Sequence, residues 1–366
     1  MKHIFLWENF GPMHADRCDA VAKTGMDVIG LELYGKSDVY DWNPEKGLNF
    51  EKITLFKSGR PRGLALILAL LKLRKNLGKS NWFLCHYEWK EVFIFASLLR
   101  LLGDNVFTMG CSKFDDFPRN SKREFLKSFF FKPYHGAIGS GVRSKSYFEF
   151  HGIPSHMVAT EYNTVSTQRI RELANFSQDK IYDDYENRYF TIVARLVPKK
   201  NLFMALDAYK IYLNSNTKPR FLKICGSGPL EADLKAYAQK LEIENYIVFM
   251  GFIQTEEISK TLSKSLALIL PSIEEQFGNV IIEAQAIALP VLLSEVCGAK
   301  DKLVRSAKNG FIFEPDNPEG LAWFMTLLSN DQKMWEKMCL SAFEYSKYGD
   351  VEAFASAVQS LLEAKS

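Results

Sequence analysis

Short apolar stretches alternate with stretches of helical length along this chain, and the alternation runs through it twice. In the first half the strand candidates are "KHIFLWENF", "DVIGLELY", "NWFLCHY", "NVFTMG" and "GAIGSG". In the second half they are "YFTIVARLV", "RFLKICGSG", "YIVFMGF", "LALILPS" and "PVLLSE". Strands that alternate with helices are typical of doubly wound parallel sheets. The pattern therefore predicts an α/β chain in which this architecture occurs twice.

The division into domains follows from length and from one polar stretch. A chain of 366 residues is long for a single core and suits two domains. Residues 166–187, "STQRIRELANFSQDKIYDDYEN", are polar and have no strand pattern. We expect a first domain at residues 1–165, an interdomain connection at 166–187 and a second domain at 188–345. The later segment "KNGFIFEPDNPEG" is expected to be rich in turns.

Cysteine usage and the lack of long apolar runs indicate a cytoplasmic protein. The six cysteines are scattered and form no C-x-x-C, which is typical of free thiols in a reducing compartment. The first residues, "MKHIFLWENF", meet an acidic residue by position 8, unlike a signal peptide. The longest apolar run, at residues 63–73, is about ten residues, whereas a membrane-spanning helix needs roughly 20.

Charge is distributed unevenly along the chain. Residues 1–165 carry 23 Lys and Arg against 17 Asp and Glu, whereas the remainder carries 23 against 26. Such asymmetry suggests two domains with different partners. The segment "RNSKREFLKSFFFK" places Phe125 and Phe129 among cations, which is typical either of a solvated face or of contact with an anionic membrane. Both interpretations stay open, and we expect no nucleic-acid partner.

The second half places charged residues and glycines directly after its strand candidates, where doubly wound sheets bind ligands. Arg195 and Lys200 follow the first of these strands in "ARLVPKKN". Three glycines follow the next two strands and would let a ligand approach the backbone: Gly226, Gly228 and Gly251. In "EEQFGNVIIE", Gly278 and Asn279 open a helix whose first N–H groups suit a phosphate.

Two carboxylates eight residues apart, Glu275 and Glu283, flank this turn. Glu275 lies in the loop before the helix and could accept hydrogen bonds from sugar hydroxyls, although adjacent Glu274 is an alternative. Glu283 is expected one to two turns inside the helix, at a rise of about 1.5 Å per residue. An unpaired carboxylate among its apolar neighbours would be costly, which favours a ligand role. Carboxylates for hydroxyls, with cations and a helix N-terminus for phosphates, indicate a nucleotide-sugar site.

These elements, in their order and spacing, resemble the retaining glycosyltransferases of family GT4, which have the two-domain GT-B fold. The resemblance rests on "ARLVPKKN", "CGSGPLEADL", "FMGFI", the E-x7-E element "EQFGNVIIEA" with "LPVLLSEVCGAKD", and "KNGFIFEPDNPEGLA". It implies two Rossmann-like domains with a cleft between them, the donor on the second and the acceptor on the first. It also implies that residues 346–366 form a C-terminal helix that crosses back to the N-terminal domain.

The resemblance further implies a role for each matching residue. Arg195 and Lys200 would neutralise the diphosphate as it leaves. Glu283 would bind the ribose hydroxyls, and Glu275 would bind the donor sugar. The backbone near Phe277, Gly278 and Asn279 would hold the sugar and the β-phosphate, and that of Gly251 and Phe252 would lie beside the base. Enzymes of this family generally need no metal, and no D-x-D sequence occurs here. We expect no cofactor, and a nucleotide diphosphate sugar, a UDP- or GDP-sugar, as the donor substrate.

The first half matches the family less tightly. "NFGPMHADR" is similar to the family's first glycine-rich loop, reduced to Gly11, with His14 as a catalytic candidate or simply a helix-start residue. "TMGCSKFDDFPR" has no histidine where many relatives carry one near the donor sugar. The acceptor-side candidates are Ser112, Lys113, Asp115 and Asp116 in that loop, His86 at the end of the preceding strand, and Asn163. His86 has the alternative of being a packed core histidine.

We therefore expect a retaining glycosyltransferase that moves a sugar from a nucleotide diphosphate sugar to a glycan or lipid-linked glycan. Surface polysaccharide or lipopolysaccharide synthesis is the expected setting, with the N-terminal domain touching the inner face of the cytoplasmic membrane. One rival is a GT-B enzyme of another reaction type, such as a nucleotide-sugar epimerase or a phosphorylase. The other rival is a non-catalytic sugar-nucleotide-binding scaffold.

Overall fold

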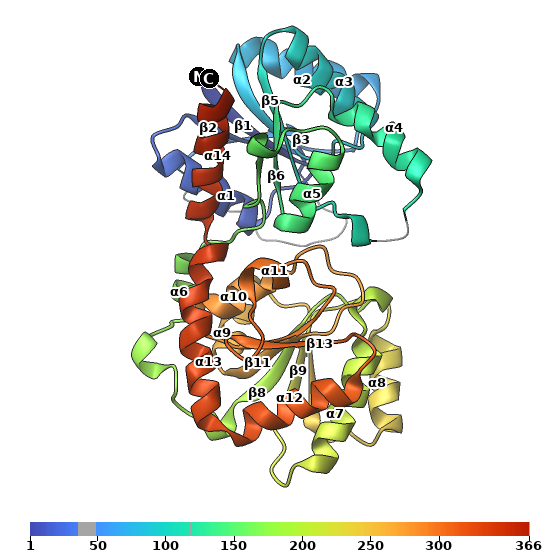
Figure 1. The fold of residues 1–366 in the computed structure, drawn as a ribbon, viewed down its shortest axis with the longest axis vertical. Helices are drawn as coiled ribbons and strands as arrows, with labels where there is room; N and C mark the ends of the chain where they lie inside the picture. The colour runs from blue at the N-terminus through green and yellow to red at the C-terminus, as the bar shows by residue number, and fades with distance from the viewer. Residues whose placement is uncertain (36–48, 117–118, 366) are drawn as a thin grey trace. The chain divides into compact units, whose positions relative to one another are not determined.

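The chain divides into two compact units, each built on one parallel sheet (Figure 1). The computed structural model describes residues 1–35, 49–116 and 119–365. Unit 1 comprises Met1–Ser166 and Val351–Ser366, and unit 2 comprises Thr167–Asp350. Every pair of neighbouring strands in both sheets runs parallel. The prediction of two doubly wound α/β domains is confirmed.

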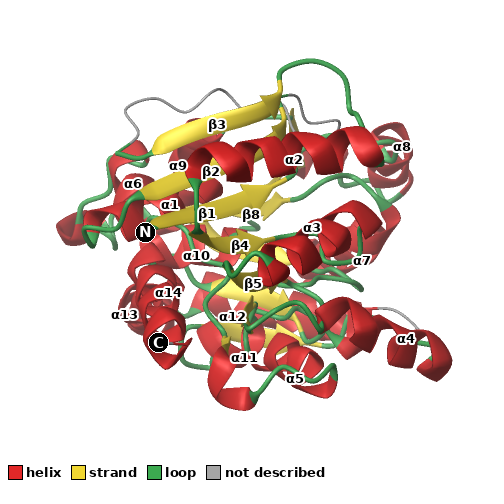
Figure 2. Cartoon of the chain, turned by 90° about the horizontal axis from the view of Figure 1, so that it is seen from above, coloured by secondary structure: helices red, strands yellow, loops and turns green. Residues whose placement is uncertain are grey.

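Unit 1 contains a seven-stranded sheet of order β3-β2-β1-β4-β5-β6-β7. Its strands are β1 Lys2–Trp7, β2 Val28–Tyr34, β3 Glu51–Phe56, β4 Ser80–Leu84, β5 Asn105–Gly110, β6 Gly136–Gly139 and β7 Val158–Ala159. Its helices are α1 Pro12–Lys23, α2 Leu64–Leu77, α3 Lys90–Leu101, α4 Ser121–Phe131, α5 Val142–Phe150 and α14 Val351–Lys365. The view along the sheet in Figure 2 shows its first five strands side by side.

A row of stacked aromatic rings forms part of the unit 1 core. Phe5, Phe83 and Phe107 are register partners on β1, β4 and β5, with ring centroids 4.7 and 4.8 Å apart. Cross-strand aromatic pairs of this kind stabilise a sheet. Phe354 of α14 packs against Phe5 at 5.7 Å, and all four rings are buried. A helix that follows unit 2 in the sequence therefore completes the core of unit 1.

Unit 2 contains a six-stranded sheet of order β10-β9-β8-β11-β12-β13. Its strands are β8 Tyr189–Val193, β9 Leu222–Cys225, β10 Ile247–Gly251, β11 Ser265–Leu270, β12 Val291–Ser294 and β13 Gly310–Phe313. Its helices are α6 Thr167–Leu173, α7 Leu202–Ser215, α8 Glu231–Lys240, α9 Thr255–Ser263, α10 Val280–Ala286, α11 Lys300–Leu303, α12 Pro318–Asn330 and α13 Gln332–Tyr345.

Two segments differ from what the sequence suggested. The expected turn-rich segment contains β13, because "GFIF" pairs with β12 and buries Phe311 and Phe313. Residues 166–187, expected to connect the domains, contain α6, and Ile181 and Tyr185 are part of the unit 2 core. The polar composition of that stretch hid the few apolar side chains that anchor it. Within the described ranges, no helix is both long and apolar enough to cross a bilayer.

Candidate functional site

Lys200 and Glu275 form an ion pair at the carboxyl ends of the strands of unit 2. Lys200 follows β8, Glu275 follows β11, and these strands are neighbours in the sheet. Each side chain is 16% exposed. The outer pair, Lys199 and Glu274, is 3.1 Å apart with side chains 47% and 38% exposed. The structure thus separates the two adjacent glutamates, because Glu275 belongs to the more buried pair and Glu274 to the solvated one.

Asn201 holds the Lys200 loop in place and was not singled out from the sequence. Its Nδ2 donates to the carbonyl of Pro271, at 3.1 Å, and to that of Pro315, at 2.7 Å. The residue adopts φ 55°, in the left-handed region that asparagine tolerates better than most side chains. Asn201 therefore ties the loop after β8 to the loops after β11 and β13. The only sequence signal was an asparagine directly after two lysines.

Arg195 is exposed, and the backbone on both sides of it is hydrogen-bonded to the loop after β9. The N–H of Ala194 donates to the Cys225 carbonyl at 3.0 Å, and the N–H of Leu196 donates to the Ser227 carbonyl at 2.9 Å. The loop is therefore fixed while the guanidinium remains accessible. This is the arrangement expected of a cation that meets a ligand rather than a neighbour.

Gly226 and Gly228 make that close approach of backbones possible. A Cβ at Gly226 would lie 1.9 Å from the Ala194 oxygen, and one at Gly228 would lie 2.4 Å from the Leu196 oxygen. Contacts this short exclude any side chain. Both glycines therefore shape the loop around Arg195, whatever contact they also make with a ligand.

Gly251 and Phe252 lie at the end of β10, beside the loop after β9. Gly251 has φ +67°, a Cβ there would meet nothing within 4 Å, and its carbonyl accepts from the Gly226 N–H at 2.7 Å. Phe252 is 47% exposed. An open backbone and an exposed aromatic ring can together cover the face of a flat ring such as a nucleobase.

The turn before α10 is fixed by a second loop, within "LPVLLSEVCGAKD", whose residues were given no role from the sequence. The Glu275 carbonyl accepts from the Gly298 N–H at 3.3 Å, and the Phe277 carbonyl accepts from the Ala299 N–H at 3.1 Å. A Cβ at Gly298 would lie 2.0 Å from the Gln276 oxygen, so only glycine fits. Phe277 is buried, which anchors the turn in the core.

Glu283 lies in the first turn of α10, not one to two turns inside it, because the helix begins at Val280 rather than at Gly278. Gly278 has φ +101° and turns the chain into the helix, with Asn279 at its N-cap. The Glu283 side chain is half-buried, whereas Ile281 and Ile282 are fully buried. Glu283 is therefore on the side of α10 that is turned away from the core.

In unit 1, His14 is a hydrogen-bond partner of its own loop. Its Nδ1 accepts from the Gly11 N–H at 3.0 Å, and its ring stacks on Trp7 with centroids 4.6 Å apart. Burial lowers the pKa of His14 well below its usual range, and the nearby Arg17 guanidinium adds to this. The ring is thus neutral with Nδ1 occupied. His14 can donate through Nε2–H, and Nδ1 is not available as a base.

His86 is half-buried and holds an unusual backbone conformation, with φ 63°. Its ring stacks on Trp89 with centroids 4.4 Å apart, and its Nδ1 lies 3.8 Å from Glu88. The Arg62 guanidinium lies 3.6 Å from the centre of the Trp89 ring. Left-handed backbone at a residue other than glycine is often found at functional sites, so the alternative of a packed core histidine loses support.

The remaining unit 1 candidates cluster after β5. Ser112 is half-buried, with its Oγ 3.0 Å from the Tyr87 hydroxyl. The Lys113 side chain is only 3% exposed and lies 3.3 Å from Asp115, which also pairs with Arg143. Burial alone would raise the pKa of Asp115, but Lys113 and Arg143 lower it overall. Asn163 donates to Cys111 Sγ at 3.4 Å, and the side chain of Asp116 lies outside the described residues.

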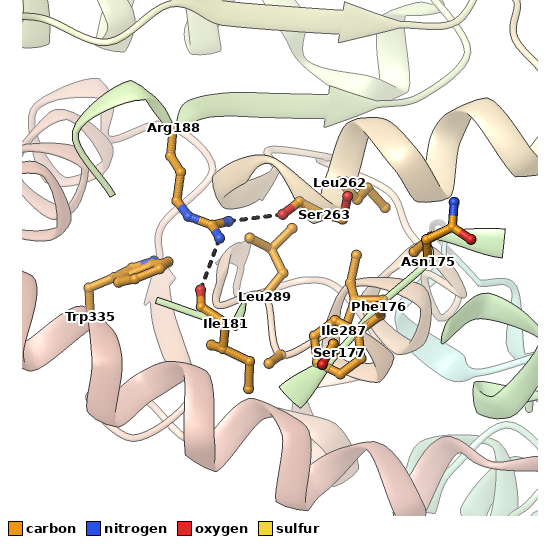
Figure 3. Close-up of a pocket in the computed structure, with 12 residues that line it drawn as sticks. Asn175, Phe176, Ser177, Ile181, Arg188, Leu262, Ser263, Ile287, Leu289 and Trp335 are labelled. Atoms are coloured by element: carbon orange, nitrogen blue, oxygen red, sulfur yellow. Dashed lines mark hydrogen bonds between the residues drawn. The ribbon is translucent and has the colours of Figure 1, made fainter. Parts of the chain in front are cut away.

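Figure 3 shows a cavity of unit 2, of about 120 Å³, at the amino ends of the strands, whereas Lys200 and Glu275 follow the carboxyl ends. Arg188, Ser263 and Leu289, which line it, precede β8, β11 and β12. Figure 3 shows the Arg188 guanidinium bonded to the carbonyls of Ser263 and Ile181, at 3.0 and 2.9 Å. Because the Arg188 guanidinium is held by backbone carbonyls, we assign Arg188 a structural role and treat the cavity as separate from the candidate site.

Comparison with known proteins gives a family match over most of unit 2. Residues 176–344 match the model of the glycosyl transferases group 1 family. An uncharacterised glycosyltransferase of Methanocaldococcus jannaschii is 29% identical over 48% of this chain and 45% of its own length. The O-antigen chain mannosyltransferase RfbU of Salmonella typhimurium is 28% identical over 38% of this chain and 39% of its own. The chain thus spans less than half the length of these relatives.

Solved structures resemble the whole chain. The Anabaena protein HepE, crystallised with UDP, aligns over 100% of both chains with a TM-score of 0.76 and 16% sequence identity. At this identity the likeness shows the fold.

Proposed function

Residues 176–344 match the glycosyl transferases group 1 family and the chain has the GT-B fold, and from that premise we propose that it is a retaining glycosyltransferase. It moves a sugar from a nucleotide diphosphate sugar to a glycan or lipid-linked glycan, in surface polysaccharide or lipopolysaccharide synthesis. The observation that carries the proposal is the Lys200–Glu275 pair at the carboxyl ends of β8 and β11, with the accessible Arg195 in the same loop after β8. A relative that acts on the O-antigen chain and a fold neighbour crystallised with UDP support this choice.

The proposed chemistry assigns fixed charges to the departing diphosphate. The bond between the anomeric carbon and the β-phosphate oxygen breaks, and the acceptor oxygen bonds to that carbon on the same face. The acceptor proton passes to the departing phosphate oxygen. Arg195 and Lys200 stabilise the charge that develops there, and preorganised cations of this kind often dominate catalysis. No metal is needed in this scheme.

The carboxylates and the backbone position the donor. Glu275, held by Lys200, accepts hydrogen bonds from hydroxyls of the transferred sugar. Glu283, on the partly exposed side of α10, accepts from the ribose hydroxyls. The backbone at Gly278 and Asn279 faces the β-phosphate, and Gly251 with Phe252 covers the base. On this proposal each part of the nucleotide sugar has a separate partner.

Nucleotide sugars are expected to raise the melting temperature of the wild type, and Glu283→Ala to abolish that rise. A ligand that binds only the folded state stabilises it by about 2.7 kcal/mol at a hundredfold excess over its Kd. The measurement is a thermal-shift screen with UDP-, GDP-, dTDP- and ADP-sugars. Glu344→Ala, an exposed glutamate on α13, is the matched control and should keep the shift. A wild type that responds to no nucleotide sugar would refute the proposed donor class.

We further propose that α4 places the enzyme on the inner face of the cytoplasmic membrane. Phe125, Leu126 and Phe129 are 68%, 61% and 47% exposed on this helix, although large apolar side chains are usually buried. Lys122 and Arg123 lie on the same helix. Exposed aromatics beside cations are typical of helices that lie in the headgroup region of anionic bilayers.

Replacing Phe125 and Phe129 together by serine is expected to abolish binding to phosphatidylglycerol vesicles. Each ring contributes about 1.5–3 kcal/mol when fully buried, so at least a tenfold loss is expected. Co-sedimentation with vesicles measures this binding. Binding of the wild type should be weaker to phosphatidylcholine vesicles and at high salt. Phe221→Ser, at a ring of unit 2 that is 49% exposed and so comparable with Phe129, should bind as the wild type does. Wild-type protein that stays in the supernatant with both lipids would rule out this membrane surface.

A further inference from the structure

Four side chains of unit 1 form a continuous chain of hydrogen bonds that ends at Ser112. The Ser112 Oγ lies 3.0 Å from the Tyr87 hydroxyl, which lies 3.4 Å from the Tyr147 hydroxyl. The Tyr147 hydroxyl donates to Glu124 Oε2 at 3.0 Å. Tyr87, Tyr147 and Glu124 are buried, and only Ser112 is partly exposed. The chain therefore leads from the interior to the carboxyl end of β5.

Glu124 is an ionised carboxylate that can only accept hydrogen bonds. Lys127 donates to its Oε1 at 2.9 Å, Arg119 lies 3.4 Å from the same oxygen, and His151 Nε2 lies 3.4 Å from Oε2. Burial alone would raise the pKa of Glu124, but hydrogen bonds from Lys127 and Tyr147 lower it overall. Burial raises the pKa of both tyrosines, which keeps their hydroxyls protonated.

This carboxylate fixes the direction of every proton in the chain. Each hydroxyl has one proton to donate. Because Glu124 only accepts, the Tyr147 proton points to Glu124, and Tyr147 must accept from Tyr87. Tyr87 has then used its own proton and must accept from Ser112. Lys127 Nζ also donates to the Tyr147 oxygen, at 3.4 Å. Because a Tyr147 proton directed at Tyr87 would leave Glu124 without this donor, the Lys127 contact supports the direction from Ser112 to Glu124.

Ser112 is consequently left with an oxygen whose proton is committed inward. Ligands of doubly wound sheets bind beyond the carboxyl ends of the strands, and Ser112 follows β5 by two residues. An oxygen with no proton to offer repels a phosphate or carboxylate, which also only accepts, and it suits the O–H of a sugar. We propose that Ser112 Oγ is an obligate hydrogen-bond acceptor that binds a sugar hydroxyl of the donor or of the acceptor. This inference rests on the proposed glycosyltransferase function.

Three variants separate this role from a structural one. Ser112→Ala removes the oxygen, and Tyr87→Phe frees the Ser112 proton by cutting the chain. Tyr134→Phe is the matched control, since the buried Tyr134 hydroxyl has no hydrogen-bond partner in the described part of the chain. All three are titrated by calorimetry with UDP, UDP-glucose and the monodeoxyfluoro analogues of UDP-glucose, or with GDP and GDP-mannose if the wild type binds only guanosine nucleotides. To test for a hydroxyl of the acceptor, binding of methyl glycosides is measured by saturation-transfer NMR in the presence of the nucleotide.

A sugar hydroxyl on the donor predicts that Ser112→Ala weakens binding of the nucleotide sugar about three- to tenfold and leaves the free nucleotide unchanged. Tyr87→Phe keeps the Ser112 oxygen as an acceptor and should bind the sugar as the wild type does, but its freed Ser112 proton should reduce the loss caused by an analogue that can only accept. Fluorine cannot donate a hydrogen bond, so replacing the bound hydroxyl by fluorine should weaken binding to the wild type as much as Ser112→Ala weakens binding of the unmodified sugar. The same analogue should bind Ser112→Ala no more weakly than the unmodified sugar does. A hydroxyl on the acceptor predicts the same loss for a methyl glycoside instead.

Wild-type-like binding of every ligand by both Ser112→Ala and Tyr87→Phe would overturn the inference and leave the proposed function standing. Equal losses in Tyr134→Phe would overturn it as well, by showing a general effect of tyrosine removal. A wild type that binds no nucleotide and no nucleotide sugar would overturn the proposed function, and this inference with it.

Discussion

Lys200→Ala is expected to lower kcat/KM for sugar transfer about 100- to 1000-fold, the loss typical when one preorganised charge is removed from a developing oxyanion. Lys200 is mostly buried and paired with Glu275, so its charge acts where water screens little. The variant also leaves Glu275 unpaired beside the departing diphosphate, which adds repulsion to the lost attraction. The loss should appear in kcat, because the charge on the leaving group grows only in the transition state. The rate of nucleotide release from the donor measures it.

Lys199→Ala is the matched control, because it removes a neighbouring lysine that also pairs with a glutamate. That pair is largely solvated, and exposed ion pairs contribute about 0–1 kcal/mol. Its kcat/KM should stay within about fivefold of the wild type. Equal losses in the two variants would show that the charge of the loop matters but the buried position of Lys200 does not. Full activity of Lys200→Ala would remove this residue from the proposed chemistry.

Gly226→Ala is expected to destabilise unit 2 by about 3 kcal/mol or more, roughly 6–12 °C in Tm. The added Cβ would sit 1.9 Å from the Ala194 oxygen, and both groups belong to backbone that cannot rotate away. To relieve the contact, the loop after β8 must separate from the loop after β9. Arg195 lies on the first of these loops, so donor affinity should fall together with stability. Urea unfolding, with hydrogen exchange in β8 and β9 as the local readout, measures the loss.

Gly251→Ala tests whether the clash rather than the backbone angle causes this loss. Gly251 also has a positive φ, but a Cβ there meets nothing within 4 Å. Its replacement should therefore cost only the strain of the left-handed conformation, about 1–2 kcal/mol. If both variants lose the same stability, the close approach to Ala194 is not what requires glycine at position 226.

The architecture could be predicted from the sequence because most strands of these parallel sheets are short apolar runs with polar or turn-forming residues at both ends. β8 and β11 are of this kind, and their ends located Lys200 and Glu275. The strand β13 was not recognised, since "GFIF" is only four residues between turn formers. Its identity as a strand depends on pairing with β12, which is a tertiary contact. The local sequence pattern does not predict that β13 pairs with β12.

The parts of the site that escaped prediction share one cause. Asn201 acts through hydrogen bonds to the carbonyls of Pro271 and Pro315, 70 and 114 positions away. Gly298 acts through its close approach to the backbone of Gln276. Neither residue type is unusual in a loop, so nothing local marks them. Distinguishing Glu275 from Glu274 likewise required the positions of Lys200 and Lys199, with which they pair in the structure. Sequence reasoning found the charged groups, and the structure was needed to find what holds them.

The packing of α14 on unit 1 has a consequence for how the protein is made. Val351–Lys365 is translated only after all of unit 2, at roughly 5–20 residues per second, so unit 1 waits on the order of ten seconds or more for its last helix. During that time Phe5 lacks its contact with Phe354 on the nascent chain. Unit 2 is contiguous in sequence and can close first. We therefore expect the core of the N-terminal unit to be completed after that of unit 2, with Phe5 left uncovered until α14 packs on it.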